Sequence, residues 1–204
     1  MSTTSSAPVG GRVGEVVHAA LELLDEQGLD AVSLRAVAGR LGVRLNTVLW
    51  HVKTKARLRE LMADAIVAEV RLDGLPADAR ERVVLLARRY REALLGHRDG
   101  GLVVAGASVT EPATLDYAEA IIGALLAAGL ADREAGWTCW TLTYFILGLV
   151  QEEQGSTGPD AEILAPALAP ERHPAMLRVL PHLVDGDFAS RFEFGLRLML
   201  AQIS

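Results

Sequence analysis

Apolar residues recur along most of this chain at the three- and four-residue spacing of an α-helix that buries one face. Alternating runs of β-branched residues, which would indicate strands, are missing, and Ala and Leu dominate the composition. We therefore predict an all-α protein. Its helices are expected near residues 13–27, 33–41, 43–50, 54–72, 78–97, 110–128, 132–152, 175–184 and 188–200.

Short polar residues predict where several of these helices begin. Ser33 and Thr54 each precede an apolar-periodic segment, and their hydroxyls can accept a hydrogen bond from a backbone N–H of the first turn. Thr110 and Asp132 occupy the same kind of position before two later helices. The stretch 154–174 is rich in Gly, Pro, Ala and Ser, and we expect it to be a long mobile loop.

The segment from Ser33 to Arg59 combines two short helical patterns with an unusual charge. Gly42 separates the two patterns, at a position that suits a left-handed turn residue. Two short helices joined by such a turn form a helix-turn-helix, whose second helix can enter the major groove of DNA. The segment contains no Asp or Glu and seven basic residues, namely Arg35, Arg40, Arg44, Lys53, Lys55, Arg57 and Arg59. Attraction to DNA phosphates is one interpretation of this charge, and an ordinary solvated surface is the alternative.

Charge is distributed unevenly between the two parts of the chain. The formal net charge is −6, yet residues 1–72 hold nine basic and eight acidic residues, while the remainder holds eleven and eighteen. The acidic remainder would be repelled by DNA, so we expect it to point away.

Composition and cysteine usage limit the possible classes of protein. A chain of 204 residues with 50% apolar content can bury one or two cores. The single cysteine, Cys139, excludes an internal disulfide and fits the reducing cytoplasm. The longest uncharged apolar run, 135–150, is too short to span a bilayer and is expected to be a buried helix. The first residues are small and polar, which indicates a disordered arm over 1–12 rather than a signal segment.

Two segments, 133–152 and 187–203, are too apolar for helices with one solvated face. A helix that is apolar on several sides lies at the centre of a domain or packs on a partner.

Three motifs give this chain a resemblance to a known family. GVRLNTVLWHVKTK, from Gly42 to Lys55, resembles the recognition-helix region of the tetracycline-repressor (TetR) family, and HRDG (97–100) and LGLVQEEQ (147–154) resemble segments of the C-terminal domain of the same repressors. The resemblance extends from about Gly14 to Leu200. It implies a helix-turn-helix domain over 13–53, a connecting helix over 54–74, and an effector-binding and dimerisation domain over 75–204.

Membership of that family would imply a ligand-responsive regulator, most often a repressor, that binds DNA as a homodimer. The helices near 133–152 and 187–203 would pair with their copies. Two recognition helices related by a two-fold axis lie about one DNA turn apart, which predicts a palindromic operator.

The resemblance also implies which residues contact DNA. Arg offers a bidentate fork to guanine and Asn the same to adenine, so the chemistry is reasonable on its own. Most of the family has Tyr where this chain has Leu49, and the tetracycline repressors have Gln-Pro at the Leu45-Asn46 positions, so the base sequence that is read should differ. For Trp50, burial in the core is the alternative. The expected DNA-contacting residues are Arg35, Arg44, Leu45, Asn46, Thr47, Leu49, Trp50, His51 and Lys55.

The same resemblance implies a small-molecule pocket in the C-terminal domain. Tetracycline repressors bind a drug–magnesium complex, but the metal-binding His corresponds to Val104 here and a second pocket His corresponds to Tyr144. Only Glu152 is retained, and a lone carboxylate is a poor magnesium site. We therefore expect no metal and no cofactor, and a hydrophobic or polycyclic effector in an apolar cavity. Its expected contacts are Tyr90, Val104, Tyr117, Ile121, Trp140 and Tyr144, with ordinary core packing as the alternative for each aromatic.

Two other functions remain open. An enzyme is disfavoured, because Cys139 lies far in sequence from any His and the chain contains no G-x-S-x-G, P-loop or dinucleotide fingerprint. The second alternative keeps the DNA-binding head and makes the rest a module for a protein partner, without small-molecule sensing.

Overall fold

The computed structural model describes residues 11–108, 110–155, 161–185 and 187–201, and within these ranges every regular element is a helix. The predicted all-α class is therefore confirmed. Most of the expected N-terminal arm, residues 1–10, lies outside the described ranges, and Arg12 already begins the first helix.

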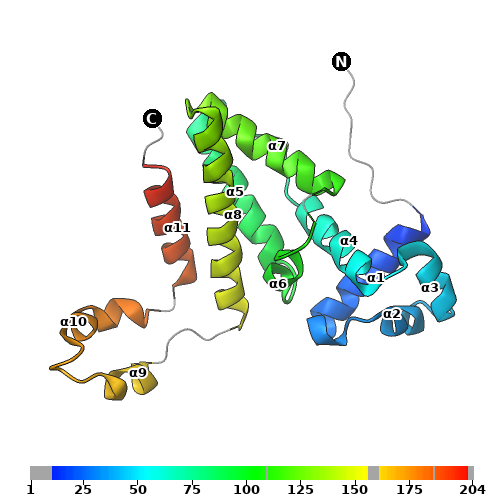
Figure 1. Ribbon diagram of the computed structural model, residues 1–204, viewed down its shortest axis with the longest axis horizontal. Helices are drawn as coiled ribbons and strands as arrows, with labels where there is room; N and C mark the ends of the chain where they lie inside the picture. The colour runs from blue at the N-terminus through cyan, green and yellow to red at the C-terminus, as the bar shows by residue number, and fades with distance from the viewer. Residues whose placement is uncertain (1–10, 109, 156–160, 186, 202–204) are drawn as a thin grey trace.

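Three helices form a small head at one end of the molecule (Figure 1). They are α1 (Arg12–Gln27), α2 (Leu34–Arg40) and α3 (Leu45–Val52), and a 3-10 turn, η1 (Leu29–Ala31), follows α1. The expected breaks are present: Gly28 ends α1 at a φ of 84°, and Gly42 joins α2 to α3 at a φ of 65°. The predicted cap at Ser33 is confirmed, since its Oγ accepts from the Ala36 N–H at 3.1 Å.

Helix α4 (Lys55–Ala68) joins the head to the rest of the chain. Thr54 caps it as predicted, because its Oγ1 accepts from the Arg57 N–H at 3.0 Å. The helix ends before the predicted limit at residue 72, with Glu69 as its C-terminal cap. It packs on α1 and α3 in the head and on α5, α6 and α7 in the body, so it belongs to both parts.

The body is built around α5 (Ala79–Leu95), α6 (Gly100–Val104), α7 (Pro112–Ala127), α8 (Asp132–Gly155) and α11 (Phe188–Met199). Figure 1 shows α11 running beside α8. The two approach closely at Gly195, where a Cβ would collide with the ring of Phe145. Phe145 in turn stacks on Phe192 with ring centroids 6.1 Å apart.

Part of the expected loop 154–174 is helical. Helix α9 (Ala161–Ala167) lies within it and includes Pro166, and α10 (Pro174–Leu183) follows. The two helices pack on each other at the end of the molecule away from the head, and neither has a buried residue (Figure 1). Residues 156–160 of the expected loop lie outside the described ranges.

Two of the predicted caps are wrong. Glu111, not Thr110, precedes α7, because Pro112 occupies the first helical position and the Thr110 hydroxyl pairs with that of Ser108 at 2.8 Å. Asp132 is the first residue of α8 rather than the residue before it. Across the described residues, no helix is both long enough and apolar enough to cross a membrane.

Candidate functional site

Three of the seven basic residues in the Ser33–Arg59 segment, Arg40, Arg57 and Arg59, bind other groups of the protein. Arg40 binds Glu26 at 2.8 Å and Glu22 at 3.3 Å, both on α1. Arg57 binds Glu60 at 3.0 Å and also Glu111. The carboxylates raise the pKa of both guanidiniums, through hydrogen bonds first of all. The acidic partners neutralise the charges of Arg40 and Arg57. These two residues therefore stabilise the fold and contribute little to the attraction of DNA phosphates.

The other four basic residues have exposed side chains and no ion pair within the described part of the chain. Arg35 is at the start of α2, Arg44 precedes the first residue of α3, Lys53 directly follows α3, and Lys55 is the first residue of α4. Uncompensated positive charge therefore flanks both ends of α3, which is the arrangement that attracts a phosphate backbone.

Helix α3 exposes one face and buries the other. Val48 and Val52, one turn apart, are fully buried in the head. Asn46, Thr47 and Trp50 are exposed, and Leu45, Leu49 and His51 are half-buried at the edges of that face. Trp50 is 82% exposed, which excludes the alternative that it is a core residue. All nine residues expected to contact DNA thus lie at least partly open to solvent: Arg35 on α2, and the others on α3 or beside its ends.

A cavity of about 440 Å³ lies in the body. Five of the six expected effector residues line it: Tyr90 from α5, Val104 from α6, Tyr117 from α7, and Trp140 and Tyr144 from α8. Ile121 does not; it is 1% exposed in the core, and the adjacent Ile122 lines the cavity instead. Sequence reasoning also missed the lining residues Ala63 and Val67 of α4, the 106–108 segment, and Cys139.

The cavity wall is apolar and uncharged. No Asp, Glu, Lys, Arg or His is among the described residues that line it. Tyr90 and Tyr117 stack with ring centroids 4.6 Å apart and planes 12° from parallel. Burial raises the pKa values of Tyr90, Tyr117 and Cys139, which keeps all three protonated near neutral pH.

No acidic or His/Cys cluster suited to a metal ion occurs within the described ranges. Glu152, the one acidic residue that the resemblance retained, is exposed and does not line the cavity. The residues present therefore do not fit a drug–magnesium complex.

Helix α4 is bound by polar contacts to the last turn of α6 and to the segment that follows it. The Arg59 guanidinium donates to the carbonyls of Val103 at 3.2 Å and Ala105 at 2.9 Å, and also to that of Leu102. These carbonyls end α6, where backbone acceptors have no partner within the helix. One turn further along α4, Asp64 accepts from the N–H and hydroxyl of Thr114 at 2.9 and 3.0 Å.

A second set of contacts joins the head to the turn between α5 and α6. His97 lies between two carboxylates, with Nδ1 3.0 Å from Asp25 of α1 and Nε2 3.0 Å from Glu69 at the end of α4. The Arg98 N–H donates to Asp25 at 3.1 Å, and Asp99 accepts from the Leu29 N–H at 2.8 Å. Burial alone would lower the pKa of His97, but the two carboxylates outweigh it and the pKa is raised.

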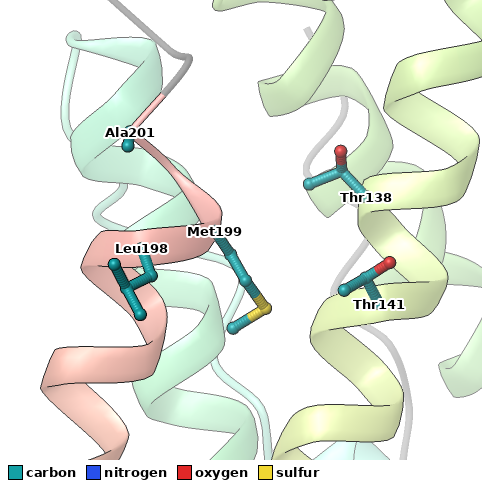
Figure 2. A pocket seen from close by; sticks show the side chains of 5 residues that line it. All are labelled: Thr138, Thr141, Leu198, Met199 and Ala201. Carbon is teal, nitrogen blue, oxygen red and sulfur yellow. The ribbon is translucent and has the colours of Figure 1, made fainter.

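An apolar face remains uncovered on α8 and α11. Trp137 and Tyr144 of α8 and Phe194 and Leu198 of α11 are all exposed. A groove of about 410 Å³ runs between the two helices, and Figure 2 shows Met199 extending from α11 toward Thr141 on α8. A face of this kind on two long helices is typical of a helix–helix interface.

Two family models together match most of the chain. Residues 16–62 match the model described as bacterial regulatory proteins of the tetR family, and residues 74–204 match the tetracyclin repressor-like C-terminal domain. The division between the models falls just after α4.

Relatives and solved structures agree with these matches. The tetracycline repressor protein class G of Vibrio anguillarum is 32% identical over 192 residues, which cover 92% of this chain and 91% of that protein. A crystal structure of a possible TetR family regulator from Streptomyces coelicolor A3(2) has a TM-score of 0.82 at 36% identity, covering 93% of this chain and 97% of that one. ActR of Streptomyces coelicolor in complex with actinorhodin has a TM-score of 0.84 at 26% identity, covering 93% and 95%.

The position of His97 predicts a pH-dependent stability. Because its pKa is raised in the folded protein, its contribution is complete below the unfolded value of about 6.5 and is lost as pH rises through the folded pKa. The free energy of unfolding of the natural protein should therefore decrease over this interval relative to His97→Gln. Urea denaturation at a series of pH values measures the difference, and a constant difference would contradict the prediction.

Proposed function

The chain belongs to the TetR family of bacterial regulatory proteins, and from this we propose that it is a homodimeric, operator-binding repressor released from DNA by a hydrophobic or polycyclic effector. The observation that carries the proposal is the double role of α4. One end of this helix follows the recognition helix, and its middle supplies Ala63 and Val67 to the cavity wall. Regulation rather than catalysis is the function that we propose.

Operator binding is supported by the charge and exposure of α3. Arg44, Lys53 and Lys55 flank its ends without an ion pair, Arg35 begins α2, and Asn46 and Thr47 are exposed on the outer face of α3. The basic residues would position the head on phosphates, while Arg44 and Asn46 would read base edges.

Release by an effector is supported by the contacts of α4 with the cavity. Residues 106–108 line the cavity and directly follow the carbonyls that Arg59 binds. A ligand that displaces this segment would shift α4 and with it the recognition helix. Such a ligand changes the head position only to the extent that it binds one arrangement more tightly than the other.

Dimerisation through α8 and α11 is supported by the uncovered apolar face on these helices. A second copy would cover the face in both chains at once, because a two-fold interface uses the same surface twice. The helices that the sequence suggested for the interface, near 133–152 and 187–203, are the ones that carry this face; residues 202–203 lie outside the described ranges.

Base reading predicts the effect of two substitutions on DNA binding. Arg44→Ala and Asn46→Ala should each weaken binding to DNA from upstream of the protein's own gene by roughly 1–3 kcal/mol. The measurement is a titration across a salt series, since affinity that depends on phosphates falls with salt. Arg80→Ala, which removes an exposed charge from α5, is the matched control and should bind like the natural protein. Binding that ignores DNA sequence and both substitutions would contradict the proposal.

The Arg59 contacts predict a separation of effector binding from DNA release. Arg59→Met retains an unbranched side chain but removes every donor to the end of α6. A polycyclic probe that releases the natural protein should bind this variant within about threefold, while release requires roughly tenfold more probe, about 1.4 kcal/mol of lost coupling. Equilibrium dialysis measures binding and a DNA mobility assay measures release. Equal changes in both would show that Arg59 does not transmit the signal.

The exposed α8–α11 face predicts the oligomeric state. Leu198 is 62% exposed in the single chain, so Leu198→Glu should leave the fold intact but place a charge in the interface. Sedimentation should find the natural protein as a dimer and this variant as a monomer. Leu126→Glu changes an exposed leucine on α7 and should remain dimeric. A dimeric Leu198→Glu would exclude this face.

A further inference from the structure

Two buried phenols in the cavity have hydroxyls that bind nothing. Tyr90 is 4% exposed and Tyr117 is 7% exposed, and both line the cavity. Neither hydroxyl has a hydrogen-bond partner among the described residues. Native proteins rarely leave a polar group of a buried residue without a partner, so a molecule in the cavity is expected to supply one.

These hydroxyls are open to the cavity rather than sealed in the core. In the described residues, the only fully enclosed side-chain nitrogen or oxygen atoms without a partner are the Nε atoms of Arg82 and Arg91. The hydroxyls of Tyr90 and Tyr117 therefore retain accessible surface, and the cavity is where that surface lies. Whatever occupies the cavity supplies their partner.

The hydroxyls of Tyr90 and Tyr117 and the indole N–H of Trp140 are hydrogen-bond donors of the cavity wall that have no acceptor among the described residues. The hydroxyl of Thr143 already donates to the carbonyl of Cys139 at 2.9 Å, and that of Thr114 donates to Asp64 at 3.0 Å. The indole N–H of Trp140 is a donor only. Burial raises the pKa values of Tyr90 and Tyr117, so both phenols retain the proton that they donate. A ligand with acceptor oxygens would satisfy these unpaired donors.

The cavity also disfavours a charged ligand. None of its described lining residues carries a charge. The nearby carboxylate of Asp64 is already bound to Thr114. A carboxylate or ammonium moved from water into such a wall would lose its hydration without gaining an opposite charge. The stacked pairs Tyr90–Tyr117 and Trp140–Tyr144 instead offer flat aromatic surface.

We propose that the cavity selects uncharged polycyclic molecules that carry carbonyl oxygens, and that the hydroxyls of Tyr90 and Tyr117 donate the hydrogen bonds that recognise those oxygens. This inference rests on the proposed function, in which the cavity is the effector site, and adds to it the chemical class of the effector and the two residues that determine specificity.

Three probes of one shape test the chemical class. Anthraquinone is uncharged with two carbonyls, anthracene has the same rings without acceptors, and anthraquinone carboxylate adds a charge. Equilibrium dialysis with the full chain should find anthraquinone bound roughly tenfold more tightly than anthracene, since each hydrogen bond accounts for a factor of about two to ten. The carboxylate should bind at least about tenfold more weakly than anthraquinone. A carboxylate that binds as tightly as anthraquinone overturns the uncharged class.

Two substitutions test the residues. Tyr90→Phe combined with Tyr117→Phe removes both hydroxyls and keeps both rings, so anthracene binding should be unchanged while the preference for anthraquinone disappears. Anthracene binding also reports whether the variant is folded. Thr47→Val is the control, because it removes an exposed hydroxyl on α3 that does not line the cavity. It should keep the preference, and a double variant that also keeps it overturns the inference.

Protection of Cys139 from reaction distinguishes a failure of the proposed effector site from a failure of the proposed recognition of carbonyl oxygens. This sole cysteine lines the cavity, so a probe bound there should slow its reaction with N-ethylmaleimide, and Cys139→Ala gives the background. Probes that protect Cys139 equally well whether or not they carry carbonyls overturn the inference and leave the proposed function standing. If no probe binds or protects Cys139, the effector role of the cavity fails and the inference fails with it.

Discussion

Helix α4 packs on the head and on the body at the same time. The arrangement of the whole chain depends on this constraint. Near its start, Leu58 lies with Leu29 and Val32 of the head, and two turns later Ala63 and Val67 form part of the cavity wall in the body. Close packing leaves little freedom on either side. In the proposed mechanism, a displacement of α4 in the body would therefore move the head with it.

The polar contacts of α4 are distributed differently from its apolar ones. Arg57, Arg59 and Asp64 all bind residues of the body between Leu102 and Thr114. Hydrogen bonds are directional, whereas apolar packing is not. The 102–114 segment of the body therefore sets the position of α4. The same segment contributes Val104 and residues 106–108 to the cavity.

Features that depend on neighbouring residues, such as helix caps and turns, could be predicted from the sequence. Contacts between distant segments could not. The caps at Ser33 and Thr54 and the turn at Gly42 follow from neighbouring residues alone. Helix α7 is apolar around much of its circumference, so periodicity could not tell that Ile122 rather than Ile121 faces the cavity. A Pro- and Ala-rich stretch predicted a loop where α9 forms, because weak propensity does not exclude a short helix.

Charge provides the clearest example of this limit. The sequence identifies a basic segment, but it does not show which of the basic side chains lack an acidic partner. Arg40 and Arg57 are compensated by acids up to 54 residues away, while Arg35 and Arg44 are not compensated within the described chain. The sequence shows which segment carries the basic residues, and only the folded contacts separate those that hold the head together, such as Arg40, from those without an ion pair, such as Arg44.

The head docks on the 97–99 turn through the Asp25 carboxylate and through main-chain groups of Glu26 and Leu29. Asp99 accepts from the backbone N–H of Leu29, and Arg98 donates to the carbonyl of Glu26 at 3.4 Å. None of the residues on the outer face of α3 takes part in this docking. Substitutions at positions such as Arg44 or Asn46 can therefore accumulate without loosening the joint. Over evolutionary time, the operator sequence and the effector chemistry of such a protein are free to diverge independently.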